Sequence, residues 1–149
     1  MNNKELKSVL VAAVLAACAA GSWAADAEHK MSFAELMESA AAQQKLDGSV
    51  RLYLQGQKTP KVLETKGQDV SNKKTNAFGK DATTTCQWAA LSALLALQEK
   101  AKRLGANAVI DIVSYYKKDA FSSPTDYECH VGAIMSGVAF KGTYAKVAQ

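Results

Sequence analysis

The sequence predicts an α+β domain in which one long helix covers a small antiparallel sheet. The stretch from residue 86 to 116 has the pattern of a long helix, a glycine stop and one strand. Runs that alternate apolar and polar residues, as half-buried strands do, precede and follow this stretch. A shorter run with helical spacing lies nearer the N-terminus. We therefore expect a β-α-β-β core with a short N-terminal helix beside it.

Residues 1–24 have the pattern of a secretory signal peptide. Two lysines give a basic start, residues 8–20 are almost wholly apolar, and the run GSWA ends in the small residues of a cleavage site. The apolar run is too short to cross a bilayer, which takes about 20 residues. We therefore expect export to the periplasm and a single domain over residues 25–149.

Cys18 offers a second interpretation of the same segment. The run LAAC at residues 15–18 resembles a bacterial lipobox, in which Cys18 would be lipidated and become the new N-terminus. The GSWA exit favours ordinary cleavage instead, and both outcomes stay open. Lipidated Cys18 would make the protein an outer-membrane lipoprotein, and we expect a membrane association only in that case.

The first helix and the first strand are predicted over residues 32–45 and 49–55. Ser32, with Glu35 three residues later, forms a capping box at the start of the helix. Gly48 ends the helical region, and the residues after it alternate between apolar and polar side chains. That alternation predicts a strand with one buried face.

Residues 61–76 are polar, with weak strand character and several lysines. One interpretation is an exposed edge strand that lysines protect from aggregation. The other is a basic patch for an anionic partner, although the segment lacks the interleaved aromatic residues of a nucleic-acid interface, so we expect no nucleic acid. The polar cluster that we single out as a candidate partner surface is Asn72, Lys73, Lys74 and Asn76.

The long helix is predicted over residues 84–104. Residues 81–85 offer several helix caps, of which Thr84 with Gln87 fits a capping box, and Gly105 fits the stop at the end of the helix. Trp88 falls in the first turns and is expected to lie in the core or to cover a disulfide. The broad apolar face consists of Trp88, Leu91, Leu94, Leu95 and Leu97.

Two strands are predicted after the long helix, over residues 107–116 and 127–147, with a loop over residues 117–126. Three glycines interrupt the last strand. Its apolar residues slip from odd to even positions beside the first glycine, so we expect a β-bulge and a bend there.

Cys86 and Cys129 are expected to form a disulfide. An even pair of cysteines in an exported chain is typical of a disulfide, and the long helix packed back on the next strand would bring the two together. The alternatives are a soft-metal site that includes His130, or a redox pair. The cysteines lack C-x-x-C spacing, and a closed zinc site needs four ligands, so we expect no metal.

No catalytic set stands out in the sequence. Cys129 and His130 are adjacent on a predicted strand, so their side chains would point to opposite faces and would not meet. A Ser-His-Asp arrangement or a carboxylate pair is not evident either. The formal net charge of +4 is mild and selects no class of partner. We expect a protein that is not an enzyme and uses no cofactor.

The runs LGANAVIDIVSYY and AIMSGVAFKGTYAKV resemble known families. Over roughly residues 84–147 the chain looks like the YbjQ-like heavy-metal-binding domains and like RcsF-type sensor lipoproteins of an envelope-stress phosphorelay. The RcsF resemblance implies a helix-to-strand disulfide from Cys86 and Cys129, whereas RcsF has four such cysteines. The YbjQ resemblance implies metal binding, for which few ligands are present here.

A resemblance over nearly the whole mature chain rests on KLDGSVRLYL, NKKTNAFGKD, the segment from residue 86 to 118 and YECHVGAIMSGVAFKG. These runs are similar to small exported proteobacterial proteins that are often labelled excinuclease ATPase subunit. An ATPase needs a phosphate loop, G-x-x-x-x-G-K-[ST], and the run FGKD at residues 78–81 lacks its first glycine and its hydroxyl residue. The residues therefore do not support that label.

Two functions remain as hypotheses. The first is a non-catalytic binding or sensing module of the periplasm or cell envelope, whose partner is an envelope protein or a small ligand. The second is a small-ligand or metal-binding oligomer of the YbjQ-like type. Self-association and a bound ligand would distinguish the second from the first.

Overall fold

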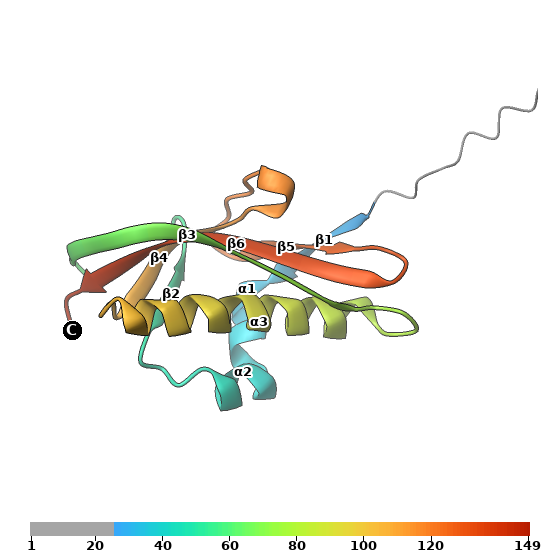
Figure 1. Ribbon diagram of the computed structural model, residues 1–149, viewed down its shortest axis with the longest axis horizontal. Helices are drawn as coiled ribbons and strands as arrows, with labels where there is room; N and C mark the ends of the chain where they lie inside the picture. The colour runs from blue at the N-terminus through green and yellow to red at the C-terminus, as the bar shows by residue number, and fades with distance from the viewer. Residues whose placement is uncertain (1–25) are drawn as a thin grey trace, which may run out of the picture.

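The computed structural model describes residues 26–149, which form a six-stranded sheet with a long helix, α3, against one face (Figure 1). The signal peptide predicted over residues 1–24, together with Cys18, lies outside the described residues. Within the described part, no helix is long and apolar enough to cross a membrane. The strands are β1 (Ala27–Ser32), β2 (Arg51–Leu54), β3 (Val62–Asn76), β4 (Ala108–Ser114), β5 (Asp126–Val131) and β6 (Met135–Val147).

The sheet is organised around β6. Strand β3 pairs antiparallel with one edge of β6 over nearly its whole length, from Val62 opposite Val147 to Asn76 opposite Met135. The other edge is shared, because β5 pairs with the start of β6 and β4 pairs with its later half. Strand β1 extends the sheet beyond β5, and β2 extends it beyond β4. The long green and red strands in Figure 1 are β3 and β6.

The fold is a mixture of helices and strands with a mainly antiparallel sheet, but the core is more complex than a β-α-β-β unit. Strand β2 runs parallel to β4. A parallel pair needs a long crossover, which the segment containing β3 and α3 supplies here. Strand β3 confirms the predicted edge strand, since β6 is its only partner among the described strands.

Helix α3 (Ala82–Arg103) supplies most of the helical side of the core. Its buried side chains include Cys86, Leu91, Leu94 and Leu97, and several alanines between them allow close packing on the sheet. Asp81 caps the helix by accepting a hydrogen bond from the backbone of Thr84 at 2.9 Å, so the cap lies earlier than the sequence predicted. The predicted stop at Gly105 is confirmed, because this residue adopts φ +70°.

Trp88 does not lie in the core, which corrects the expectation from helical spacing. Trp88 is 48% exposed, and the Lys45 ammonium lies 5.3 Å from the centroid of the indole ring. The long helix packs over β3 and β6, and the arc of apolar residues on α3 is wider than the surface that these strands cover. Trp88 falls outside the covered part.

The N-terminal helix predicted over residues 32–45 is two short helices, α1 (Phe33–Glu38) and α2 (Ala40–Lys45). Ser39 separates them with extended backbone angles, and its hydroxyl accepts a hydrogen bond from the backbone of Ala42. The predicted cap at Ser32 is confirmed by its hydrogen bond from the backbone of Glu35. Strand β1, which precedes α1, was not predicted.

The long strand predicted over residues 127–147 is a hairpin of β5 and β6. A tight turn between them is closed by a hydrogen bond from Gly132 N to Met135 O at 2.8 Å. The slip in the apolar pattern therefore marks a reversal of the chain and not a β-bulge. A register shift between β4 and β6 does occur, but farther along β6, between Ile110 and Val113 of β4.

The predicted disulfide between Cys86 and Cys129 is present. It joins the second turn of α3 to β5, with a Cα–Cα distance of 5.7 Å, and both residues are fully buried. A bridge that closes a loop of this length contributes about 4 kcal/mol in the chain-entropy account. Because each sulfur is bonded to the other, neither acts as a thiolate ligand or nucleophile in this structure.

Candidate functional site

The four residues proposed as a partner surface lie near the end of β3, but they do not form one surface. Successive side chains on a strand point to opposite faces. Lys73, together with the neighbouring Asn72, lines a groove beside α3, whereas Lys74 lines a cleft on the opposite face of the sheet. Asn76 belongs to the turn after the strand, where its side chain accepts a hydrogen bond from the backbone of Phe78 at 2.9 Å.

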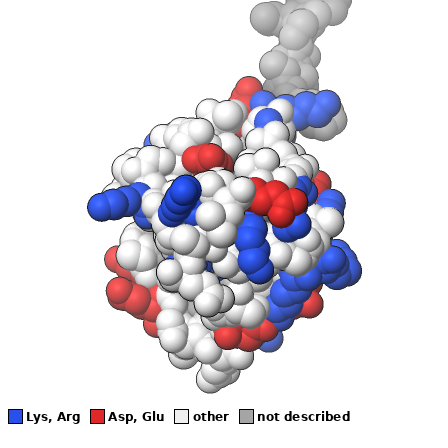
Figure 2. All heavy atoms as spheres, turned by 90° about the vertical axis from the view of Figure 1, so that its left-hand side faces the viewer, with Lys and Arg blue, Asp and Glu red and all other residues white. Residues whose placement is uncertain are grey.

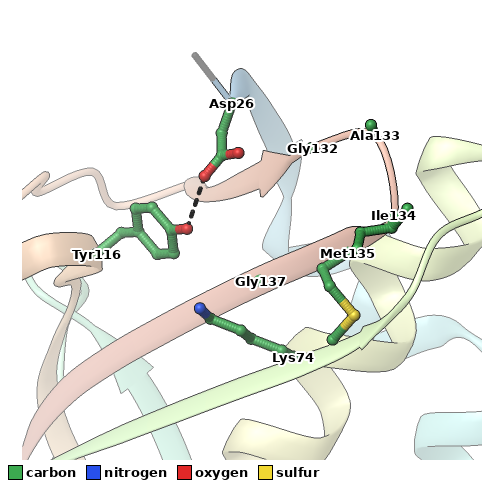
Figure 3. A pocket seen from close by; sticks show the side chains of 8 residues that line it. All are labelled: Asp26, Lys74, Tyr116, Gly132, Ala133, Ile134, Met135 and Gly137. Atoms are coloured by element: carbon green, nitrogen blue, oxygen red, sulfur yellow. Dashed lines mark hydrogen bonds between the residues drawn. The ribbon is translucent and has the colours of Figure 1, made fainter. Parts of the chain in front are cut away.

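The cleft beside Lys74 has a volume of about 170 Å³. It is bounded by Asp26, by Tyr116 of the 3-10 helix η1 (Tyr116–Lys118) and by the β5–β6 turn. In Figure 3, Asp26 and Tyr116 meet on one side of β6 and Lys74 reaches over the strand from the other side. Gly137 makes room for the tyrosine, because a Cβ at that position would lie 3.2 Å from the Tyr116 ring.

Tyr116 is held firmly in the cleft. Its hydroxyl donates a hydrogen bond to Asp26 Oδ2 at 2.9 Å, and its ring stacks on His130 with the centroids 3.8 Å apart and the planes 10° apart. Burial and the neighbouring Asp26 carboxylate raise the pKa of the phenol above its ordinary value. Tyr116 therefore acts as a neutral, oriented hydrogen-bond donor.

A charged cluster lies behind the Tyr116–His130 stack, on β1 and β5. The Lys30 ammonium is 3.1 Å from a carboxylate oxygen of Glu28 and 3.1 Å from one of Glu128. The hydrogen bond from Lys30 lowers the pKa of Glu28, and the two carboxylates raise the pKa of Lys30. The side chain of Glu128 is only 11% exposed, so this partly buried carboxylate depends on Lys30 for its partner.

His130 completes this cluster. Its Nε2 atom lies 3.8 Å from Glu128 Oε2 and is buried without a hydrogen-bond partner among the described residues. One ligand atom from each of Glu28, Glu128 and His130 falls within 4.8 Å of the others, which is close enough to hold a metal ion. The Lys30 ammonium already supplies a positive charge there.

Sequence reasoning identified His130 but missed Glu28, Lys30 and Glu128. The spacing of Glu128 and His130, two residues apart on a strand, was a usable signal because such residues share one face. The pairing that brings Glu28 opposite His130 was not available, because β1 was not predicted. The expectation that Cys129 and His130 point apart is confirmed, since Cys129 is bonded in the core and His130 stacks on Tyr116.

The groove beside Lys73 has a volume of about 310 Å³ and lies between β3 and the last turns of α3. Lys100 and Arg103 line its helical side, and Asp69, Ser71 and Lys73 line its strand side. Tyr144 of β6 also lines it, and the Tyr144 hydroxyl lies 3.4 Å from Asp69 Oδ2.

Both signs of charge occur on the end of the molecule that carries the C-terminus of α3. Figure 2 looks onto that end and shows basic and acidic side chains interspersed.

No protein-family model matches the chain, and no curated protein matches it. The function is therefore argued from the geometry of the cleft, the charged cluster and the groove.

Proposed function

We propose that the chain is a non-catalytic binding or sensing module of the cell envelope that resides in the periplasm. The observation that carries the proposal is the set of mutual contacts in the cleft and in the charged cluster behind it. Tyr116 is held by Asp26 and His130, and Lys30 is held by Glu28 and Glu128. These contacts hold the side chains in place and give a shaped, polar surface.

The same contacts argue against catalysis. A nucleophile needs an adjacent base and a lowered pKa, whereas the pKa of Tyr116 is raised. Both described cysteines are consumed by the disulfide. The buried disulfide supports an oxidising compartment, and the signal-peptide pattern and the resemblance to RcsF-type sensors support the envelope.

The proposal is tested by photo-crosslinking in living bacteria that export the full chain. A photo-reactive phenylalanine analogue at position 74, in the cleft, should give a discrete cross-linked species from the periplasmic fraction. The same analogue at position 58, an exposed lysine in the loop before β3, is the matched control and should give none. A protein found in the cytoplasm with free thiols would contradict the proposal.

The charged cluster favours a second candidate function, the binding of a divalent metal. His130 Nε2, which is buried with no hydrogen-bond partner in the part of the chain that the structure describes, and the two nearby carboxylates are donors that Zn²⁺ accepts. Three protein ligands would leave an open position. Lys30 disfavours metal binding, because its ammonium is paired with both carboxylates. Metal binding would require this side chain to leave.

Zn²⁺ titration against a chromophoric chelator separates the two candidates. If the cluster binds metal, Lys30→Met should tighten binding and His130→Gln should weaken it by about tenfold or more. The sedimentation of the zinc-loaded protein would show whether an oligomer forms. Equal behaviour of the wild type and both variants would eliminate the metal-binding candidate and leave the binding module.

A further inference from the structure

We propose that the free edge of β3, together with the groove between β3 and α3, binds an extended acidic segment of a partner protein as an added strand. This surface is separate from the cleft, because the sheet lies between Lys73 and Lys74. The proposal therefore stands apart from the function argued for the cleft. It rests on the strand edge, on the charge of the groove and on a buried hydroxyl group.

The strand edge is long and regular over residues 68–76. The pairing of β3 with β6 proceeds without a shift from Gln68 opposite Thr143 to Asn76 opposite Met135. Among the described residues, no strand pairs with the other edge of β3. The regular stretch begins after Gly67, which adopts φ +95° at a register shift. An edge of this kind can accept an extended peptide through main-chain hydrogen bonds.

The groove beside this edge carries an excess of positive charge. Lys73, Lys100 and Arg103 face it, with Asp69 as the only carboxylate among its lining residues. Asp69 already pairs with Lys100 at 2.5 Å, and that hydrogen bond lowers the pKa of the Asp69 carboxyl. Lys73 and Arg103 make no ion pair with any residue that the structure describes. Their charges are therefore available to carboxylates of a partner.

Ser71 is the independent observation that points to a ligand. It lines the groove between Asp69 and Lys73, is 7% exposed, and its hydroxyl has no hydrogen-bond partner among the described residues. A buried hydroxyl without a partner is unfavourable, because it has lost its hydrogen bonds to water and gained none in return. A polar group of a bound segment that enters the groove can supply that partner.

A second copy of this chain fits the same edge poorly. Pairing two β3 strands would bring Lys66, Lys73 and Lys74 of both copies along one seam, and like charges opposite each other destabilise a sheet. An acidic segment reverses that effect. Alternating carboxylates on the segment would face Lys73 and Arg103 while its backbone extends the sheet.

The test uses a fluorescent ten-residue peptide of alternating valine and glutamate, with the valine–lysine peptide as its counterpart. Fluorescence anisotropy with the full chain should show binding of the acidic peptide only. The double variant Lys73→Glu, Arg103→Glu should lower the affinity by about tenfold or more. Lys58→Glu, which changes an exposed lysine in the loop before β3, is the control and should alter the affinity by less than about twofold.

Hydrogen exchange shows whether the bound peptide is an added strand. Amide protons of residues 68–76 that exchange quickly in the free protein should become protected when the acidic peptide is bound. Equal binding of the two peptides, equal binding by the double variant, or no new protection on β3 would overturn the proposal. Concentration-dependent dimerisation without peptide, lost in the double variant, would assign the edge to a second copy instead.

Discussion

Gly142 on β6 illustrates how one absent side chain shapes the sheet. A Cβ at this position would lie 2.7 Å from Val109 Cγ1 and 3.2 Å from Ile112 Cγ1, because the irregular part of β4 presses against it. We predict that Gly142→Ala lowers the free energy of unfolding by about 1–3 kcal/mol. Urea denaturation measures the change. Gly132→Ala is the control and should be milder, since the one close approach of its Cβ, at 2.8 Å, would be to the end of the Asp26 side chain.

The buried tyrosines predict a loss of stability at high pH. Burial raises the pKa of Tyr144 from 10.0 to about 12, and burial also raises the pKa of Tyr127. The folded state therefore keeps these phenols protonated where the unfolded chain would ionise them. This contribution is fully present below pH 10.0 and is lost as the pH rises towards about 12.

Urea denaturation at several alkaline pH values should show this fall in the wild type. Tyr144→Phe should show a shallower fall, because one of the titrating groups is gone. As the pH is raised, phenolate absorbance should appear at higher pH than it does for free tyrosine, as long as the far-ultraviolet circular dichroism stays native. Complete ionisation of the tyrosines near pH 10.0 in a protein that remains folded would contradict the prediction.

Individual residues were predictable from sequence where a covalent or local rule applies. The pairing of Cys86 with Cys129 followed from the order of the elements along the chain and from the even number of cysteines after the predicted signal peptide. Trp88 was misplaced because helical spacing defines an apolar arc but not the width of the surface that will cover it. The partners of His130 were missed because they lie on a strand whose pairing is non-local.

The cap of α3 gives a prediction at the scale of an element. Asp81 Oδ2 accepts hydrogen bonds from the backbone and the hydroxyl of Thr84. Asp81→Ala should lower the free energy of unfolding by about 1 kcal/mol, because a helix N-terminus loses its capping acceptor. Thr84→Ala should lower the free energy of unfolding by less, since the backbone N–H of residue 84 still donates to Asp81. Thermal denaturation compares the two, and a larger loss for Thr84→Ala would place the cap where the sequence suggested it.

Elements were predictable where caps and apolar periodicity agree, as for α3 and its stop at Gly105. They were not predictable where the chain reverses within a continuous pattern. Ser39 interrupts a helical pattern because its hydroxyl bonds to backbone groups on both sides, accepting from Ala42 and donating to Leu36. The β5–β6 turn interrupts a strand pattern in the same manner. In both cases a local hydrogen bond outweighed the periodicity.

The disulfide gives a prediction for the molecule as a whole. Reduction of the wild type should lower the free energy of unfolding by about 4 kcal/mol, because the unfolded chain gains the freedom that the bridge removes. Urea denaturation with and without reductant measures the loss. The variant Cys86→Ala, Cys129→Ala should be insensitive to reductant, and a wild type that is equally insensitive would show that the bridge contributes little to stability.

The central place of β6 has a consequence for the order in which the chain can fold. Strands β3, β4 and β5 each precede β6 in the chain, and each pairs with it. While the chain is being synthesised, these three strands cannot pair with β6 until residues 135–147 have been made. A nascent chain halted before Met135 lacks the central strand of its sheet. The architecture thus delays completion of the sheet until the last strand has been synthesised, and the export proposed above would benefit from that delay.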